Sequence, residues 1–210
     1  MEKLDLRKQY KDLYQPSAKK VVLVEVPSFP FIMIDGQIEA GCAPENSPSL
    51  QQAFELLYGI AYTLKFASKL RAENPIDYKV MAMEGLWWTP GGGFDMQHPE
   101  NWHWTAMILQ PDHITPEMFA EAQAQLKQKK PHLPVEKLRL ERFDEGLCVQ
   151  IMHIGPYADE PPTIARMHTF AAENGYGLRG KHHEIYLGDP RRTAPERLKT
   201  VLRQPVELAG

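Results

Sequence analysis

The hydrophobic pattern of the chain opens with a strand. Apolar residues dominate positions 20–26, and Pro27 and Pro30 interrupt the run. Proline lacks the backbone N–H that a sheet ladder needs, so this strand is expected to bend or to lie at a sheet edge. The strand resumes over residues 31–34, and the pair Asp35-Gly36 predicts a turn directly after it.

The next segment changes to helical spacing. Apolar residues recur every three or four positions from residue 50 to residue 70, which predicts an amphipathic helix. Ser49 is the expected N-cap, and Asn74-Pro75 stops the pattern. Two strands are then predicted over residues 78–88 and 102–109, as antiparallel partners.

A linker and a short helix complete the first half. The linker between the two strands, from Thr89 to Glu100, carries three consecutive glycines and is expected to be mobile. A polar helix should follow up to about Lys129, with Thr115 as its cap and Pro116 in its first turn.

The second half repeats this pattern. Strands are predicted over residues 137–143 and 147–154, joined by the tight turn Asp144-Glu145-Gly146. A helix over about 158–173 comes next, and strands follow over 182–187 and 199–205.

The order strand, helix, strand, strand therefore occurs twice, over about residues 19–112 and 137–206. We expect an α+β fold made of a duplicated module with a pseudo-twofold axis, whose antiparallel sheets enclose a central cleft. The two copies would form a single domain over residues 19–206. Residues 1–18 are rich in charge and are expected to form a partly ordered N-terminal arm.

Composition narrows the class of protein. The net charge of the 210-residue chain is −3, which argues against direct binding of nucleic acid. No apolar run approaches the roughly 20 residues that cross a bilayer, and the charged N-terminus lacks a signal peptide, so a cytoplasmic location is expected. The two cysteines, far apart in sequence, are expected to be free thiols. We expect a monomer or a weak dimer.

The clearest candidate chemistry lies in the strand over 182–187. Side chains alternate between the two faces of a strand, so His182, Glu184 and Tyr186 share one face. The other face, with His183 and Ile185, suits packing against a helix. The polar row is either a solvated or internally hydrogen-bonded face, or the lining of a pocket. In a pocket, the glutamate would be a candidate proton acceptor near neutral pH.

Tryptophans form a second cluster, because all four lie between residues 87 and 104. Trp87 and Trp88 point to opposite faces of their strand, while Trp102 and Trp104 share a face of the next. Their flat rings suit stacking against a planar ligand, although core filling is the alternative for each one. The adjacent glycines are not a phosphate cradle, because no Gly-Lys-Ser/Thr follows them.

No metal or cofactor is expected. His182 and His183 point apart on a strand, and the other histidines lack the spacing of a zinc site. The chain also has neither a Gly-x-Ser-x-Gly elbow nor a dinucleotide-binding fingerprint.

Together, four motifs resemble the GyrI-like small-molecule-binding family, over nearly the whole chain from about Lys19 to Val206. They are Met152–Tyr157, Lys181–Leu187, Asp189–Arg192 and Glu84–Trp88. The resemblance implies a duplicated module with a ligand cleft between the copies. The same fold serves as the effector domain of some transcription regulators, in which a glutamate that matches Glu184 meets the ligand.

The resemblance also implies a stand-alone protein, similar to hydrolases that open the strained ring of DNA-alkylating cyclopropanoids. Glu184 would then deprotonate a water, and Tyr186, His182 or Tyr157 would donate to the developing oxyanion. The expected ligand is a small, planar, apolar molecule held by aromatic side chains. The ligand-binding candidates are Trp87, Trp88, Trp104, Tyr157, Tyr58 and Tyr62.

Two alternatives stay open. The chain could bind and sequester a flat aromatic or cationic drug or effector without chemistry. It could also be a protein-interaction partner, although no exposed apolar helix is expected from the sequence. The segment Gln37–Gly41 departs from the glycine- and asparagine-rich loop of many relatives, which leaves the shape of the cleft entrance and the ligand open.

Overall fold

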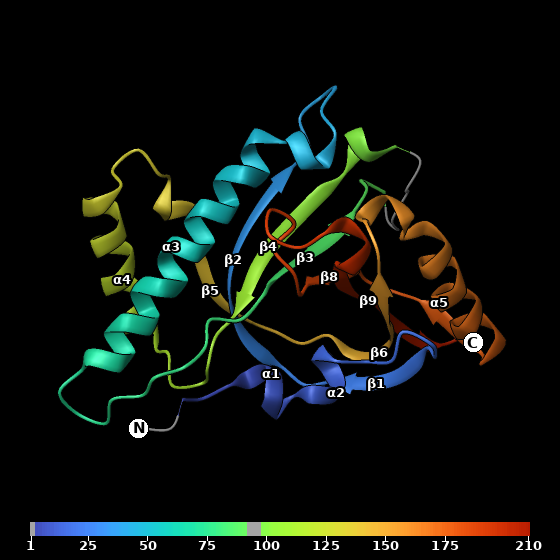
Figure 1. Cartoon of the computed structure of the whole chain (residues 1–210), viewed down its shortest axis with the longest axis horizontal. Helices are drawn as coiled ribbons and strands as arrows, with labels where there is room; N and C mark the ends of the chain where they lie inside the picture. Colours follow the sequence, from blue (N-terminus) through green and yellow to red (C-terminus); the bar gives the residue numbers. More distant parts are fainter. Residues whose placement is uncertain (1–2, 92–97) are drawn as a thin grey trace.

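The computed structural model describes residues 3–91 and 98–210, drawn in colour in Figure 1. Half of the linker that was expected to be mobile, residues 92–97, lies outside the described residues. Within the described ranges, no helix is long and apolar enough to cross a membrane.

Most of the predicted elements are present, with different ends. In the first module they are β1 (Val22–Val26), β2 (Phe29–Gln37), α3 (Pro48–Leu70), β3 (Met83–Trp88), β4 (His103–Leu109) and α4 (Pro116–Lys129). In the second they are β5 (Arg139–Phe143), β6 (Gly146–Ile154), α5 (Pro161–Glu173), β7 (Tyr176–Leu178), β8 (His182–Tyr186) and β9 (Lys199–Leu208). The short strand β7 was not predicted.

The strands form one continuous antiparallel sheet in the order β1-β6-β9-β8-β3-β4-β2-β5, and β7 pairs with β9. The order is symmetric about the central pair: β6, β9 and β8 on one side match β2, β4 and β3 on the other. The α+β fold with a duplicated, pseudo-twofold module is therefore confirmed. The two copies share one sheet through β3 and β8.

The edge strands are exchanged between the modules. β1 pairs with β6 of the second module, and β5 pairs with β2 of the first. The two strands joined by the turn Asp144-Glu145-Gly146 therefore do not pair with each other, since the chain crosses there from one module to the other. Gly146 has a φ of 68°, a conformation that favours glycine.

Helices α3 and α5 lie on the two halves of the fold, and α4 packs on α3 (Figure 1). α3 contacts β2 and β4, and α5 contacts β6 and β7. Each buries one apolar stripe, such as Leu56, Ile60 and Leu64 of α3.

Two local predictions are wrong: the turn at Asp35-Gly36 and the N-cap of α3 at Ser49. Asp35 and Gly36 continue β2 and pair with Thr105 and Trp104. The chain stays extended at this point and does not turn. Glycine allows close packing here, since a Cβ on Gly36 would lie 2.2 Å from the Trp104 indole. The N-cap of α3 is Ser47, whose hydroxyl accepts a hydrogen bond from the backbone N–H of Leu50, and not Ser49.

The N-terminal segment, which was expected to form a partly ordered arm, is packed against the domain. It forms α1 (Leu6–Gln9) and α2 (Lys11–Tyr14), and Leu6, Leu13 and Tyr14 are buried. The carbonyl of Leu13 accepts a hydrogen bond of 2.9 Å from Arg203 of β9. The segment is ordered because the apolar side chains within this charged stretch cover the sheet face opposite α5.

Candidate ligand-binding site

The central strand β8 presents His182, Glu184 and Tyr186 on the sheet face that α5 covers. Tyr186 donates a hydrogen bond of 2.7 Å to Oε2 of Glu184, and Nε2 of His182 lies 3.3 Å from Oε1 of the same carboxylate. His182 and Glu184 are both buried. Tyr186 thus holds one oxygen of the glutamate, and His182 lies next to the other.

A tryptophan from β3 extends this row. Nε1 of Trp87 donates a hydrogen bond of 2.9 Å to the hydroxyl of Tyr186. Burial and the negative charge of Glu184 raise the pKa of Tyr186 well above its usual value. The phenol therefore keeps its proton and acts as a donor to Glu184 throughout the physiological range.

Gly85 of β3 makes room for this arrangement. It pairs directly with Glu184 across the central strands. A Cβ at this position would lie 2.9 Å from Nε1 of Trp87 and 3.0 Å from the Tyr186 hydroxyl. Any side chain here would push those two donors apart, so the site requires glycine.

Glu160 is a second carboxyl group at the site, and the sequence reasoning missed it. It is the N-cap residue of α5 and is 4% exposed. Burial and the negative charge of Glu184 raise the pKa of Glu160 to about 9. At neutral pH the site therefore holds a protonated carboxyl group, that of Glu160, beside Glu184. The available signal was Glu160-Pro161-Pro162, an acidic residue fixed in place by a proline-rich helix start.

Within the described residues, Oε1 of Glu160 has no hydrogen-bond partner. A buried polar atom without a partner is costly in a folded protein, and such atoms mark positions that a ligand or water can satisfy.

Tyr157 covers the row from the solvent side. It belongs to the short helix Tyr157–Asp159, is 38% exposed, and meets the Tyr186 ring edge-on at a centroid distance of 5.6 Å. Burial, together with the charges of Glu160 and Glu184, raises the pKa of Tyr157 to about 12. Tyr157 thus offers a protonated phenol on a partly exposed ring beside Tyr186.

Tyr58 and Tyr62 belong to an aromatic stripe on α3. The stripe consists of Tyr58, Tyr62, Phe66 and Leu70, spaced four residues apart and between 38% and 74% exposed. The expectation that the chain has no exposed apolar helix is therefore wrong. The rings of Tyr58 and Tyr62 have centroids 6.5 Å apart, and burial raises the pKa of Tyr58.

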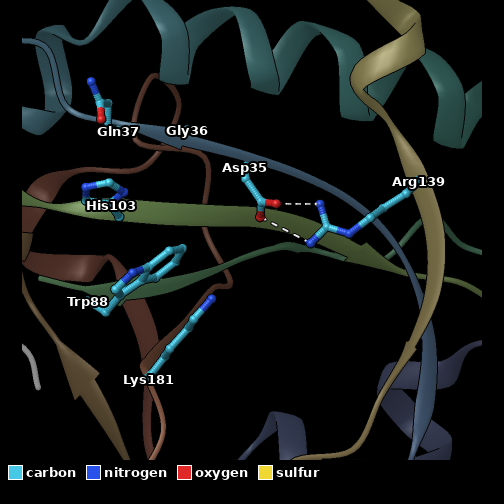
Figure 2. A pocket seen from close by; sticks show the side chains of 7 residues that line it. All are labelled: Asp35, Gly36, Gln37, Trp88, His103, Arg139 and Lys181. Atoms are coloured by element: carbon cyan, nitrogen blue, oxygen red, sulfur yellow. Dashed lines mark hydrogen bonds and ion pairs between the residues drawn. The ribbon is translucent and has the colours of Figure 1, made fainter. Parts of the chain in front are cut away.

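The tryptophans do not form one wall. Trp87 joins the Glu184 row, and Trp104 is 2% exposed and packs on Gly36 in the core of the same sheet face. Trp88 lies on the opposite face, beside His103 and under the ammonium of Lys181 (Figure 2). The structure therefore separates Trp88 from the Glu184 row by the thickness of the sheet.

The opposite face of β8, which was expected to pack against a helix, carries an ionic network around His183 that includes Tyr14 of α2. His183 donates hydrogen bonds of 2.9 Å to Glu84 and 2.8 Å to Glu145. Arg203 binds the other oxygen of Glu145 at 3.1 Å, and the hydroxyl of Tyr14 donates to Glu84 at 2.7 Å. All five side chains are buried.

The charges of this network support one another. Burial alone would lower the pKa of His183, but Glu145 and Glu84 outweigh it and raise the pKa to about 9. Burial alone would raise the pKa of Glu145, but His183 and Arg203 hold it at about 2. His183 and Glu145 are therefore both ionised at neutral pH, and the network links strands β3 and β8 of the two modules.

Comparison with known proteins was made at three levels. A family model described as the GyrI-like small molecule binding domain matches residues 19–207. No match was found among curated proteins. A crystal structure of an uncharacterized conserved protein from Listeria innocua is 39% identical, with 98% of this chain and 100% of that chain covered and a TM-score of 0.89.

Two further structures from Listeria innocua are each described as a hydrolase. They are 36% and 38% identical to this chain, with TM-scores of 0.82 and 0.83. In both comparisons 98% of this chain and 100% of the other are covered.

Proposed function

The chain belongs to the family of GyrI-like small molecule binding domains, and on that premise we propose that it hydrolyses a planar electrophilic ligand, opening the strained ring of a cyclopropanoid. The similarity to two proteins described as hydrolases supports hydrolysis as the reaction class. The observation that carries the proposal is the pair formed by protonated Glu160 and Glu184.

The pair suits the addition of water across a ring bond. Glu184 accepts a proton from a water molecule, whose oxygen forms a bond to the strained ring carbon. The ring C–C bond breaks, and its electron pair passes to the conjugated carbonyl oxygen of the substrate. Glu160 delivers its proton to that oxyanion, and the proton gained by Glu184 then passes to Glu160, which restores both groups.

Tyr186 has a positioning role in this scheme. Its hydrogen bond to Oε2 leaves Oε1 of Glu184, on the side of His182, as the oxygen that receives the proton. Because the phenol keeps its proton, Tyr186 stabilises the carboxylate before the reaction and does not compete with it as a base.

Aromatic side chains at the mouth would hold the planar substrate. Tyr157, Tyr58 and Tyr62 are between 38% and 48% exposed, so their rings are available for stacking. Trp87 contributes from the inner side through its contact with Tyr186. Trp88, on the other face of the sheet, takes no part in this proposal.

The test uses a cyclopropanoid and mass spectrometry. Wild-type protein should yield a product heavier by one water. Glu184→Gln should bind the ligand and lose turnover by about 10²–10⁴-fold, the usual contribution of a general base. Glu160→Gln should lose turnover as well, while Glu121→Gln, on the exposed surface of α4, should behave as wild type. Full turnover in Glu184→Gln would rule out the mechanism.

A second candidate function is sequestration of a flat cationic ligand. It is favoured by the buried carboxylate of Glu184, whose protein partners are the neutral Tyr186 and a histidine. In that case the compound co-elutes with the protein at unchanged mass. Glu184→Gln would then weaken binding of a lipophilic cation while sparing its neutral analogue.

A further inference from the structure

A hollow lies on the sheet face opposite Glu184, where β2, β3 and β4 end. Its volume is about 430 Å³, within the range of pockets that hold small molecules. Figure 2 shows its lining: Asp35, Gly36, Gln37, Trp88, His103, Arg139 and Lys181. None of these residues except Trp88 was a site candidate, and none serves the proposed hydrolysis.

One wall of the hollow is formed by Arg139, whose guanidinium is fully paired with carboxylates. The two terminal nitrogens of Arg139 bind the two oxygens of Asp35 at 2.8 and 3.1 Å, and Nε binds Glu141 at 2.7 Å. Thr105 donates a further hydrogen bond of 2.7 Å to Asp35. This wall pairs one guanidinium with two carboxylates, so it offers no free cation to a ligand.

The opposite wall carries the ammonium of Lys181, which interacts with Asp35 and Glu141 only through space. The ammonium of Lys181 lies 3.3 Å from the centroid of the Trp88 ring, a cation–π contact. In the part of the chain that the structure describes, it forms no ion pair with a carboxylate. Burial lowers the pKa of Lys181, as expected for a cation partly removed from water.

Aromatic surface adjoins this ammonium. The rings of Trp88 and His103 lie 5.7 Å apart at an interplanar angle of 36°. Gln37 adds an amide that can donate or accept a hydrogen bond, and Gly36 leaves strand backbone exposed between them. In Figure 2, Trp88 and Lys181 face the Asp35–Arg139 pair across the hollow.

From these features we propose that the hollow is a second ligand site, which takes a small planar aromatic monoanion such as an aromatic carboxylate. The single negative charge pairs with Lys181, and the ring system packs against Trp88 and His103. A dianion would meet Asp35, and a neutral molecule would leave Lys181 without a counter-charge. The site is separate from the Glu184 row, because Trp87 and Trp88 project from opposite faces of β3.

The experiment is a calorimetric titration of the full-length protein with 2-naphthoate and with the neutral analogue 2-naphthamide. We expect one saturable naphthoate site, at least tenfold tighter than naphthamide. Lys181→Met keeps the aliphatic stem over Trp88 and removes the charge, so it should weaken naphthoate at least tenfold and leave naphthamide unchanged. Trp88→Leu should weaken both ligands.

Two matched variants locate the binding. Lys129→Met, at the exposed end of α4, should bind naphthoate as wild type does, and so should Glu184→Gln. Circular dichroism establishes that each variant is folded. The proposal is overturned if no saturable binding is found, if Lys181→Met binds naphthoate like wild type, or if Glu184→Gln abolishes the binding.

Discussion

On each face of strand β8 a histidine lies near two glutamates, and the two faces differ in how these charges are balanced. On one face, His183 and Arg203 form ion pairs with Glu84 and Glu145. On the other, Glu184 and Glu160 share the site with His182, and Glu160 stays protonated. A balanced buried network stabilises the fold, whereas a surplus carboxyl group leaves a proton that can be moved.

The largest effect on stability is expected from removing one charge of the buried network on the His183 face of β8. Arg203→Met should lower the free energy of unfolding by about 3–5 kcal/mol, because it leaves Glu145 buried with only one of its two cationic partners. Urea denaturation measures the change. Arg139→Met is the matched control, since its ion pair with Asp35 is half-exposed and should contribute about 0–1 kcal/mol. Equal losses in both variants would contradict the comparison.

The pH dependence of stability sharpens the comparison further. The pKa of Glu160 is raised from 4.5 to about 9 on folding, so the folded state binds this proton more tightly and stability falls as pH rises between these values. Glu160→Gln should therefore flatten the decrease in unfolding free energy between pH 5 and 9. An unchanged profile would show that Glu160 is ionised in the folded protein.

His183 should remain responsible for part of that decrease. Its pKa rises from 6.5 to about 9, so the stability from its charge is fully present below pH 6.5 and is lost as pH rises through 9. The residual slope in Glu160→Gln should thus begin above pH 6.5.

A smaller effect on stability is expected from adding a side chain next to the Glu184 row. Gly85→Ala would place a Cβ 2.9 Å from Nε1 of Trp87, which should destabilise the protein by about 1–3 kcal/mol and reduce ligand turnover. Gly177→Ala, in the strand β7, meets nothing within 4 Å and is the matched control. Thermal denaturation of both variants gives the difference, and equal melting temperatures would count against the close packing.

The smallest effect concerns one hydrogen bond. Trp87→Phe removes the donor to Tyr186 and should cost about 1 kcal/mol in unfolding free energy. In turnover, it should act through Tyr186, so Trp87→Phe combined with Tyr186→Phe should lose less than the sum of the two single losses. If the turnover losses of the two single variants simply add in the double variant, Trp87 does not act through Tyr186.

Local pattern accounts for much of what could be predicted. The spacing of apolar residues identified α3, α4 and the central strands, and strand alternation put His182, Glu184 and Tyr186 on one face. It also put Trp87 and Trp88 on opposite faces, yet both were still taken as walls of one pocket. That error arose because a cluster in sequence was equated with a cluster in space.

The sequence by itself determined the elements, the duplication and the alternation of side chains, because these depend on neighbours a few residues apart. Only the tertiary structure decided which strands pair and which charges meet. β5 joins β2 in the other module, and Glu160 reaches Glu184 from the start of α5. Such contacts join residues far apart in the chain, and the burial that keeps Glu160 protonated exists only after the sheet and helix have packed together.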